Sequence, residues 1–145
     1  MKVLYNARAH VTGGRAEGHG RTEDGQLEVD LRLPEEMGGQ GGGTNPEQLF
    51  AVGYAACFEG ALGVVARRHA AEVGDVAIDS QVKLLPTEER GFKLAVDLDV
   101  ELPSVEDAET AKELVAAAHQ VCPYSNATRG NVEVALTANG EPVSA

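Results

Sequence analysis

The chain has 145 residues, of which 43% are hydrophobic, and a formal net charge of −11 at pH 7. This length suits one domain spanning residues 1–145, with an aliphatic core because tryptophan is absent and only 4% of residues are aromatic. The negative charge argues against nucleic acid or an anionic membrane surface as a partner.

The N-terminus carries charged and polar residues within its first ten positions, which is not the pattern of a signal peptide. The longest apolar run, residues 51–66, is interrupted by Glu59 and is too short to span a bilayer. We therefore expect a cytoplasmic protein. Because structural disulfides are rare there, the two cysteines are expected to be free, catalytic or redox-sensing.

The first third of the chain is predicted to be an antiparallel meander. Apolar residues alternate with polar ones over residues 3–11, which predicts a strand, and Gly13 and Gly14 then turn the chain and leave Arg15 just past the tip. Asp24-Gly25 is a hairpin signal, and residues 27–33 alternate as a second clear strand.

A glycine-rich segment, residues 38–43, follows this meander. It is not a phosphate-binding P-loop, because no Gly-Lys-Ser/Thr comes after it. It serves either as a mobile connector or as a loop that leaves room at the start of the next helix.

Residues 45–66 are predicted to form the central helix. Asn45 can cap it with Pro46 at the first helical position, or Thr44 can cap it with Glu47 closing a capping box. Its small and apolar residues recur at helical spacing, at Leu49, Val52/Gly53, Ala56, Gly60 and Gly63/Val64. Because its glycines lower helix propensity, this helix must be held by tertiary packing, so we expect the stripe to be buried in close backbone packing, with Cys57 in the middle of the helix.

The second half is predicted to contain a hairpin, a helix and a last strand. Residues 76–84 and 92–100 alternate as an antiparallel pair around a turn at residues 86–91. Ser104 with Asp107 predicts the start of a second helix, whose buried stripe is Ala108, Ala111, Val115, Ala118 and Cys122. Residues 132–136 form a last strand. The class is α+β, with antiparallel sheets packed around two main helices, and the pattern leaves the strand order open.

Cys57 and Cys122 are the residues most able to carry chemistry, and both fall on predicted helices. They form no CxxC motif, and the four histidines are scattered, so neither a metal site nor a histidine-activated cysteine hydrolase is expected. Two readings remain. Both thiols are inert core residues, or one attacks a peroxide and the other captures the resulting sulfenic acid as a disulfide.

A peroxide-cleaving thiol needs a cation beside it that lowers its pKa. The arginines near the candidate elements are Arg15, Arg67, Arg68 and Arg129. Arg67 and Arg68 lie roughly 15 Å along a helix from Cys57 and are expected to be solvated. Arg15, beside two glycines, is either an exposed turn residue or a cation free to fold over a site.

Four segments together resemble the organic hydroperoxide resistance (Ohr) proteins of the Ohr/OsmC family. They are Gly43–Phe50 (GTNPEQLF), Gly53–Phe58 (GYAACF), Cys122–Asn131 (CPYSNATRGN) and Thr12–Arg15 (TGGR). The third is specific to the Ohr proteins, whereas the helix motif is shared more widely in the family. The resemblance covers nearly the whole chain.

The resemblance implies an OsmC-like fold in an intertwined homodimer, acting as a thiol peroxidase that reduces organic hydroperoxides to alcohols. It implies Cys57 as the peroxidatic cysteine, Cys122 as the resolving cysteine, and Arg15 with Glu47 as the activating pair. It also implies no metal or other cofactor, and reduction by dihydrolipoyl groups on a lipoylated protein. The alternative that the residues leave open is a thiol redox sensor without turnover.

Glu47 poses a geometric question for that assignment. Ten helical residues place it about 15 Å along the axis from Cys57, so it cannot serve that thiol directly within one straight helix. Either the long side chain of an arginine bridges Glu47 and Cys57, or Glu47 precedes the regular helix, or it comes from the other subunit. The alternative is that Glu47 only caps the helix. Phe50, Tyr54 and Phe58 are expected to give the site an apolar lining that favours an organic hydroperoxide over hydrogen peroxide.

Overall fold

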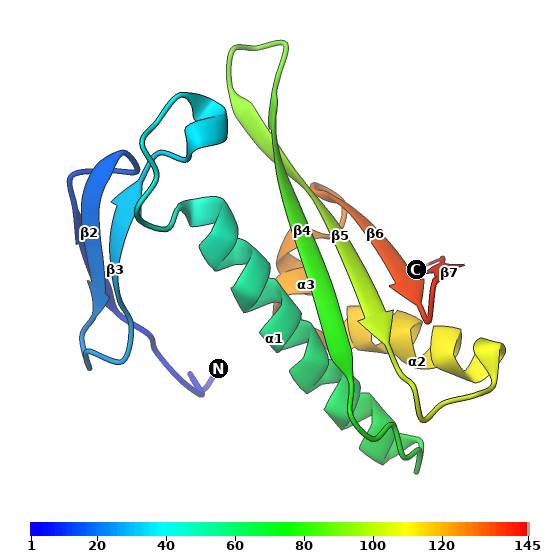
Figure 1. Ribbon diagram of the computed structural model, residues 1–145. Helices are drawn as coiled ribbons and strands as arrows, with labels where there is room; N and C mark the ends of the chain where they lie inside the picture. The colour runs from blue at the N-terminus through cyan, green and yellow to red at the C-terminus, as the bar shows by residue number, and fades with distance from the viewer. Residues whose placement is uncertain (145) are drawn as a thin grey trace. The chain divides into compact units, whose positions relative to one another are not determined.

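The computed structural model describes residues 1–144 as two compact units, residues 1–49 and residues 50–144. Helix α1 (Pro46–Arg68) begins in the first unit and continues into the second. Most of the elements of each unit are labelled in Figure 1. That the whole chain behaves as one domain stays a prediction.

The first unit is a three-stranded antiparallel sheet in the order β1-β2-β3, with β1 at Ala9–Thr12, β2 at Glu17–Thr22 and β3 at Glu28–Arg32. The predicted meander is confirmed, but the first strand is shorter than expected, because residues 1–8 have no ladder partner within the described chain. Gly13 and Gly14 turn β1 into β2 with positive φ, a region that glycine enters without steric cost. A short 3-10 helix, η1 (Glu35–Met37), precedes the glycine-rich segment.

Asn45 caps α1, since its side-chain oxygen accepts a hydrogen bond from the backbone N–H of Gln48 at 2.8 Å. Pro46 occupies the first helical position, where its missing N–H costs nothing. The alternative cap is wrong: the Thr44 hydroxyl donates to the Gln48 side chain, at 2.8 Å. Glu47 is therefore free for another partner.

The buried face of α1 is not the predicted small-residue stripe. The residues that it buries include four large side chains and two alanines: Tyr54, Phe58, Ala61, Leu62, Val65 and Ala66. Val52 is 72% exposed, and a Cβ added at Gly60 would meet nothing within 4 Å. Large apolar side chains gain more from burial than alanine or glycine, so they determine which face packs on the core of this unit.

The second unit contains a four-stranded sheet in the order β4-β5-β6-β7, with β4 at Ala77–Pro86, β5 at Phe92–Glu101, β6 at Glu133–Ala138 and β7 at Glu141–Val143. The predicted hairpin, β4 with β5, is antiparallel as expected. The expectation of purely antiparallel sheets is wrong at one ladder, because β5 and β6 run parallel. A parallel pair needs a crossover, and the segment containing α2 and α3 supplies it.

The N-cap of helix α2 (Ala108–Val121) lies three residues after the predicted cap at Ser104. Asp107 is itself the cap, and its carboxylate accepts the N–H of Thr110 at 3.0 Å. The predicted stripe is confirmed at Ala111, Val115, Ala118 and Cys122, but Ala108 is exposed. A third helix, α3 (Pro123–Thr128), follows immediately and was not predicted.

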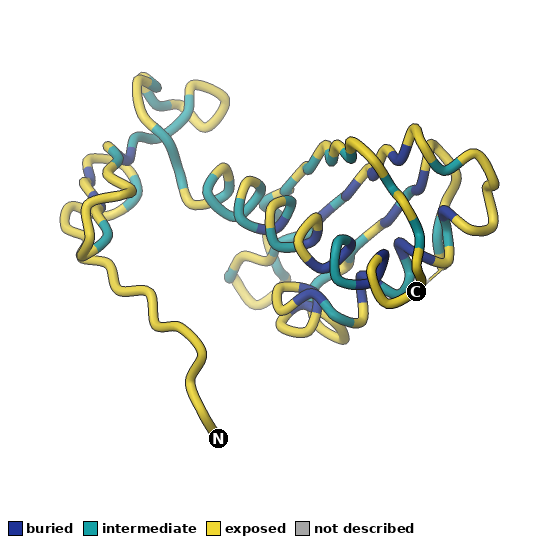
Figure 2. Tube along the Cα trace, turned by 90° about the horizontal axis from the view of Figure 1, so that it is seen from below, coloured by how far each residue is buried: buried dark blue, intermediate teal, exposed yellow. Residues whose placement is uncertain are grey.

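The core of the second unit lies between its sheet and its helices. Buried and exposed residues alternate along β5, with Val96, Leu98 and Val100 facing the helices, which lie on one face of the sheet (Figure 2). At 23 residues α1 is long and apolar enough to cross a membrane, contrary to the expectation from the shorter apolar run. Its most apolar side chains, however, form part of this core, which accounts for its composition.

Candidate active site

The two cysteines meet in the second unit. Cys122 Sγ lies 3.5 Å from Cys57 Sγ, and both thiols are free. Cys57 is partly exposed on α1, whereas Cys122 is completely buried. A disulfide requires the sulfurs to approach to about 2.05 Å, so a small movement would join them. Of the two residues, Cys57 is thus the more accessible and Cys122 the protected one.

Cys122 occupies the junction of α2 and α3. It ends α2, with its N–H bonded to the Ala118 carbonyl at 2.9 Å, and it is the N-cap residue of α3. Pro123 at the first position of α3 prevents the helix from running on, because proline lacks an N–H and fixes φ. The Cys122-Pro123 sequence thus ends α2 and begins α3 at the residue that carries the sulfur.

The surroundings of Cys57 favour its neutral thiol. Burial raises its pKa above the ordinary value, the backbone N–H of Tyr124 lowers it by hydrogen bonding to the sulfur, and the Cys122 thiol raises it again. No lysine or arginine contributes to this shift in the part of the chain that the structure describes. A cation would have to be brought to the sulfur to make it a thiolate at neutral pH.

Arg15 and Glu47 form an ion pair within the first unit. One guanidinium nitrogen, Nη2, lies 2.6 Å from Glu47 Oε1 and 2.7 Å from Oε2. Arg15 lies in the β1–β2 turn, and Glu47 in the first turn of α1, where the helix dipole favours a carboxylate. The side chains are 38% and 16% exposed respectively, so one guanidinium edge remains free for another anion.

Sequence reasoning missed a buried polar cluster in the second unit. Tyr54 Oη lies 2.8 Å from Ser125 Oγ and 3.1 Å from Thr128 Oγ1, and His119 Nδ1 lies 2.9 Å from Ser125 Oγ. Arg129 donates to the backbone carbonyl of His119, so it bonds the end of α2 and does not face a thiol. The signal for this cluster was the density of polar residues in the CPYSNATRGN segment, where each small hydroxyl has a buried partner.

Aromatic side chains beside the cysteines are arranged differently from the expected lining. The rings of Phe50, Tyr54 and Tyr124 are mutually in contact, with centroids 5.7–5.9 Å apart. Tyr54 and Phe58 have no exposed surface, so both belong to the core rather than to an open wall. Tyr124 is 38% exposed, and Phe50 is partly buried. These two, rather than Phe58, are available to an apolar substrate.

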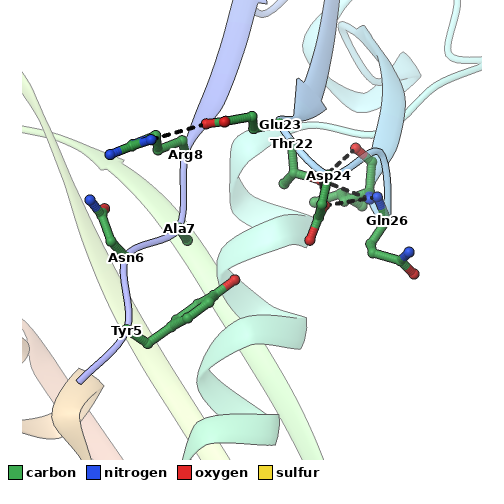
Figure 3. Close-up of a pocket in the computed structure, with 9 residues that line it drawn as sticks. Tyr5, Asn6, Ala7, Arg8, Thr22, Glu23, Asp24 and Gln26 are labelled. Atoms are coloured by element: carbon green, nitrogen blue, oxygen red, sulfur yellow. Dashed lines mark hydrogen bonds and ion pairs between the residues drawn. The ribbon is translucent and has the colours of Figure 1, made fainter.

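One hollow of the first unit lies away from the predicted residues. It is lined by residues 5–8 and by the turn between β2 and β3, where Arg8 pairs with Glu23 (Figure 3). None of the four predicted site residues lines it. Among residues 1–144 there is also no group of three or more histidine, cysteine and acidic side chains suited to hold a metal ion.

Comparison with known proteins agrees with the resemblance seen in the motifs. The family model for OsmC-like protein matches residues 39–137. The organic hydroperoxide resistance protein of Xanthomonas axonopodis pv. citri (strain 306) is 52% identical over 140 residues, which cover 94% of this chain and 95% of the relative.

Two solved structures are similar over most of the chain. The organic hydroperoxide resistance protein OsmC from Legionella pneumophila has a TM-score of 0.89 and 52% identity, covering 93% of this chain and 97% of the other. The organic hydroperoxide resistance protein OhrB of Bacillus subtilis has a TM-score of 0.83 and 50% identity, covering 92% and 98% respectively.

Proposed function

Since the chain belongs to the Ohr/OsmC family, with a role in the detoxification of organic hydroperoxides, we propose that it is a cysteine-based peroxidase that reduces these compounds to alcohols. The observation that carries the proposal is the 3.5 Å contact between the sulfurs of the partly exposed Cys57 and the buried Cys122. Cys57 is the residue that a substrate can reach, and Cys122 lies where its sulfur can capture the sulfenic acid formed on Cys57.

The proposed cycle has three balanced steps. The Cys57 thiolate attacks the terminal peroxide oxygen, the O–O bond breaks, and the alkoxide takes up a proton and leaves as an alcohol, which makes Cys57 a sulfenic acid. The Cys122 sulfur then attacks Cys57 and releases water as the disulfide forms. An external dithiol reduces the disulfide, returning two thiols and becoming a disulfide itself.

We assign to Arg15 the stabilisation of the Cys57 thiolate and of the charge that develops on the peroxide oxygens. Glu47 would orient the guanidinium, a role supported by the 2.6 and 2.7 Å contacts to one of its nitrogens. The observed pair uses a single guanidinium nitrogen, Nη2. The other nitrogens stay available for a peroxide, as this role requires.

The remaining features of the proposal come from the resemblance. We expect a homodimer in the cytoplasm, with dihydrolipoyl groups of a lipoylated protein as the reductant. A homodimer would sediment at about twice the 15.2 kDa mass of the chain. Sedimentation as a monomer at micromolar concentration would contradict the homodimer but would leave the proposed thiol chemistry unaffected.

The test of the proposed function is turnover. Cumene hydroperoxide should be consumed in large molar excess over enzyme when dihydrolipoamide is supplied, with one cumyl alcohol formed per peroxide. Consumption that stops at one equivalent despite the dithiol would contradict the peroxidase and favour the redox sensor. Peptide mapping under non-reducing conditions should find the Cys57–Cys122 crosslink within one chain after one equivalent of peroxide.

A further inference from the structure

Four buried side chains of the second unit form an unbroken series of hydrogen bonds around the segment that carries Cys122. Tyr54 lies on α1, His119 on α2, and Ser125 and Thr128 on α3. None is more than 6% exposed. Besides the three side-chain contacts described above, Thr128 Oγ1 donates to the backbone carbonyl of Ser125 at 3.2 Å.

The hydrogens of this series can be assigned by counting donors. Each hydroxyl has one hydrogen, and that of Thr128 is given to the Ser125 carbonyl, so Thr128 accepts from Tyr54. Tyr54 must then accept from Ser125. Ser125 in turn accepts from Nδ1–H of His119, which assigns this histidine tautomer from the network. All four bonds then have one donor and one acceptor.

The ends of α2 and α3 are also fastened to each other by Arg129. One guanidinium nitrogen donates to the His119 carbonyl at the end of α2, and the other donates to Asn126 Oδ1 at 2.9 Å. A six-residue helix is far too short to be stable alone. The position of α3, and with it that of Cys122, therefore depends on these side-chain bonds.

We propose that this network, with the Ser125 hydroxyl as its hub, is a positioning device that keeps the Cys122 sulfur within reach of Cys57. In the peroxidase cycle proposed above, on which this role rests, it governs the joining of the two sulfurs rather than the attack on peroxide. The 3.5 Å separation closes to a bond more readily the more of the time the two sulfurs spend near the reactive geometry. None of the four network side chains bonds to either sulfur in the described contacts, so their role is positioning.

The first test measures the tendency of the disulfide to form without using peroxide. The effective concentration of the two thiols is obtained by equilibrating the whole protein with reduced and oxidised glutathione. Ser125→Ala and Tyr54→Phe should each lower it about tenfold, the value of one well-placed hydrogen bond. Ser80→Ala is the matched control, because the Ser80 hydroxyl is buried on β4 with no partner in the described chain, and it should leave the value unchanged.

Effective concentrations for Ser125→Ala and Tyr54→Phe within about twofold of the wild-type value would overturn the proposal, since these hydrogen bonds would then not position Cys122. Because no peroxide is involved, this result is independent of the peroxidase assay. A wild type that fails to turn over cumene hydroperoxide would refute the proposed function, while the glutathione equilibrium would still decide whether the network positions Cys122.

The second test separates the two steps of the oxidative half-cycle. After mixing with one equivalent of peroxide, the sulfenic acid on Cys57 is trapped with dimedone at increasing times. Tyr54→Phe should prolong its lifetime about tenfold, while peroxide consumption stays close to the wild-type rate. Equal slowing of both steps would mean that the substitution disturbs the fold in general, and the positioning role would be wrong.

The third test uses the assigned tautomer. Asparagine can place an amide N–H near the position of Nδ1, whereas glutamine places its amide further out, so His119→Asn should keep the disulfide tendency and His119→Gln should lose it. Equal values for the two variants would overturn the network as drawn. These variants and Tyr54→Phe also keep the proposal testable if Ser125→Ala does not fold.

Discussion

The sulfur pair and the ion pair are held in very different ways. Cys122 is fully buried at a helix junction that several side-chain hydrogen bonds fasten. Arg15, by contrast, lies on a turn beside two glycines with positive φ, and its guanidinium is held by the carboxylate of Glu47. The geometry of the sulfurs is thus fixed by the fold, whereas the position of the cation depends on one ion pair. Substitutions at the two places should therefore differ in kind as well as in size.

The largest expected effect is the loss of all peroxide consumption in Cys57→Ser, because a serine hydroxyl cannot act as the sulfur nucleophile. Cys122→Ser should behave differently: its Cys57 reacts once with peroxide and then stalls or over-oxidises, since no thiol captures the sulfenic acid. Stopped-flow consumption of cumene hydroperoxide measures both. Retained turnover in Cys57→Ser would remove this residue from the mechanism.

Arg15→Ala is expected to slow the peroxide step by about 100-fold, the usual cost of losing one preorganised donor to a developing anion. Glu47→Gln should cost less, because the arginine stays in place but is less firmly oriented. Arg8→Ala is the control, since Arg8 is an exposed arginine of the same unit whose contact with Glu23 is long, at 3.5 Å. The rate of peroxide reaction is measured under single-turnover conditions.

Reduction of the disulfide should be affected much less by Arg15→Ala, because the disulfide carries no charge for the guanidinium to stabilise. Equal losses in the two half-reactions would show that Arg15 is only structural. An unchanged pKa of the Cys57 thiol in this variant would show that the guanidinium does not act on the reduced sulfur.

The sequence allowed the α+β class, both hairpins and the inward direction of Cys122 to be predicted, because alternation and helical spacing report directly on which face is buried. It misled on α1. There the glycines and alanines at helical spacing looked like a packing stripe, whereas the buried face is marked by the larger Tyr54, Phe58 and Leu62. Helical spacing alone does not show which of two apolar stripes on one helix is buried, whereas the size of the side chains does.

The parallel ladder and the polar network could not be predicted in the same way. Whether β6 pairs parallel to β5 depends on where the crossover through α2 and α3 returns, which is a long-range property of the fold. Tyr54 and Ser125 are 71 positions apart, so their hydrogen bond leaves no local pattern. The two cysteines and Arg15 were candidates from the residues themselves, but the roles of the four site residues came from the family motifs. The structure pairs Cys57 with Cys122 and Arg15 with Glu47.

A smaller effect is expected on the pH dependence of the stability of the second unit, through His119. Burial, with the charge of Arg129, lowers the pKa of His119 below its ordinary 6.5. As pH falls below 6.5, the unfolded chain binds a proton at this histidine more readily than the folded chain does. This contribution to stability is therefore complete above pH 6.5 and is lost as pH falls towards the lowered pKa. Urea midpoints measured on both sides of this window should rise with pH, and more steeply in the wild type than in His119→Asn. Equal slopes would contradict the burial of a neutral histidine.

The smallest effect is expected at His19, an exposed histidine of β2. Its contribution to stability changes with pH in the direction opposite to that of His119. Hydrogen bonds to Asp30 and Glu28, at 3.1 and 2.8 Å, raise its pKa above 6.5. The folded chain then holds a proton that the unfolded chain releases, so this stabilisation is complete below 6.5 and is lost as pH rises through the raised pKa. His19→Gln should remove that dependence, whereas His10→Gln, at an exposed position on the neighbouring β1, is the control. The titration of His19 followed by NMR gives the direct check, and a midpoint at or below 6.5 would show that the two carboxylates do not hold the imidazolium in solution.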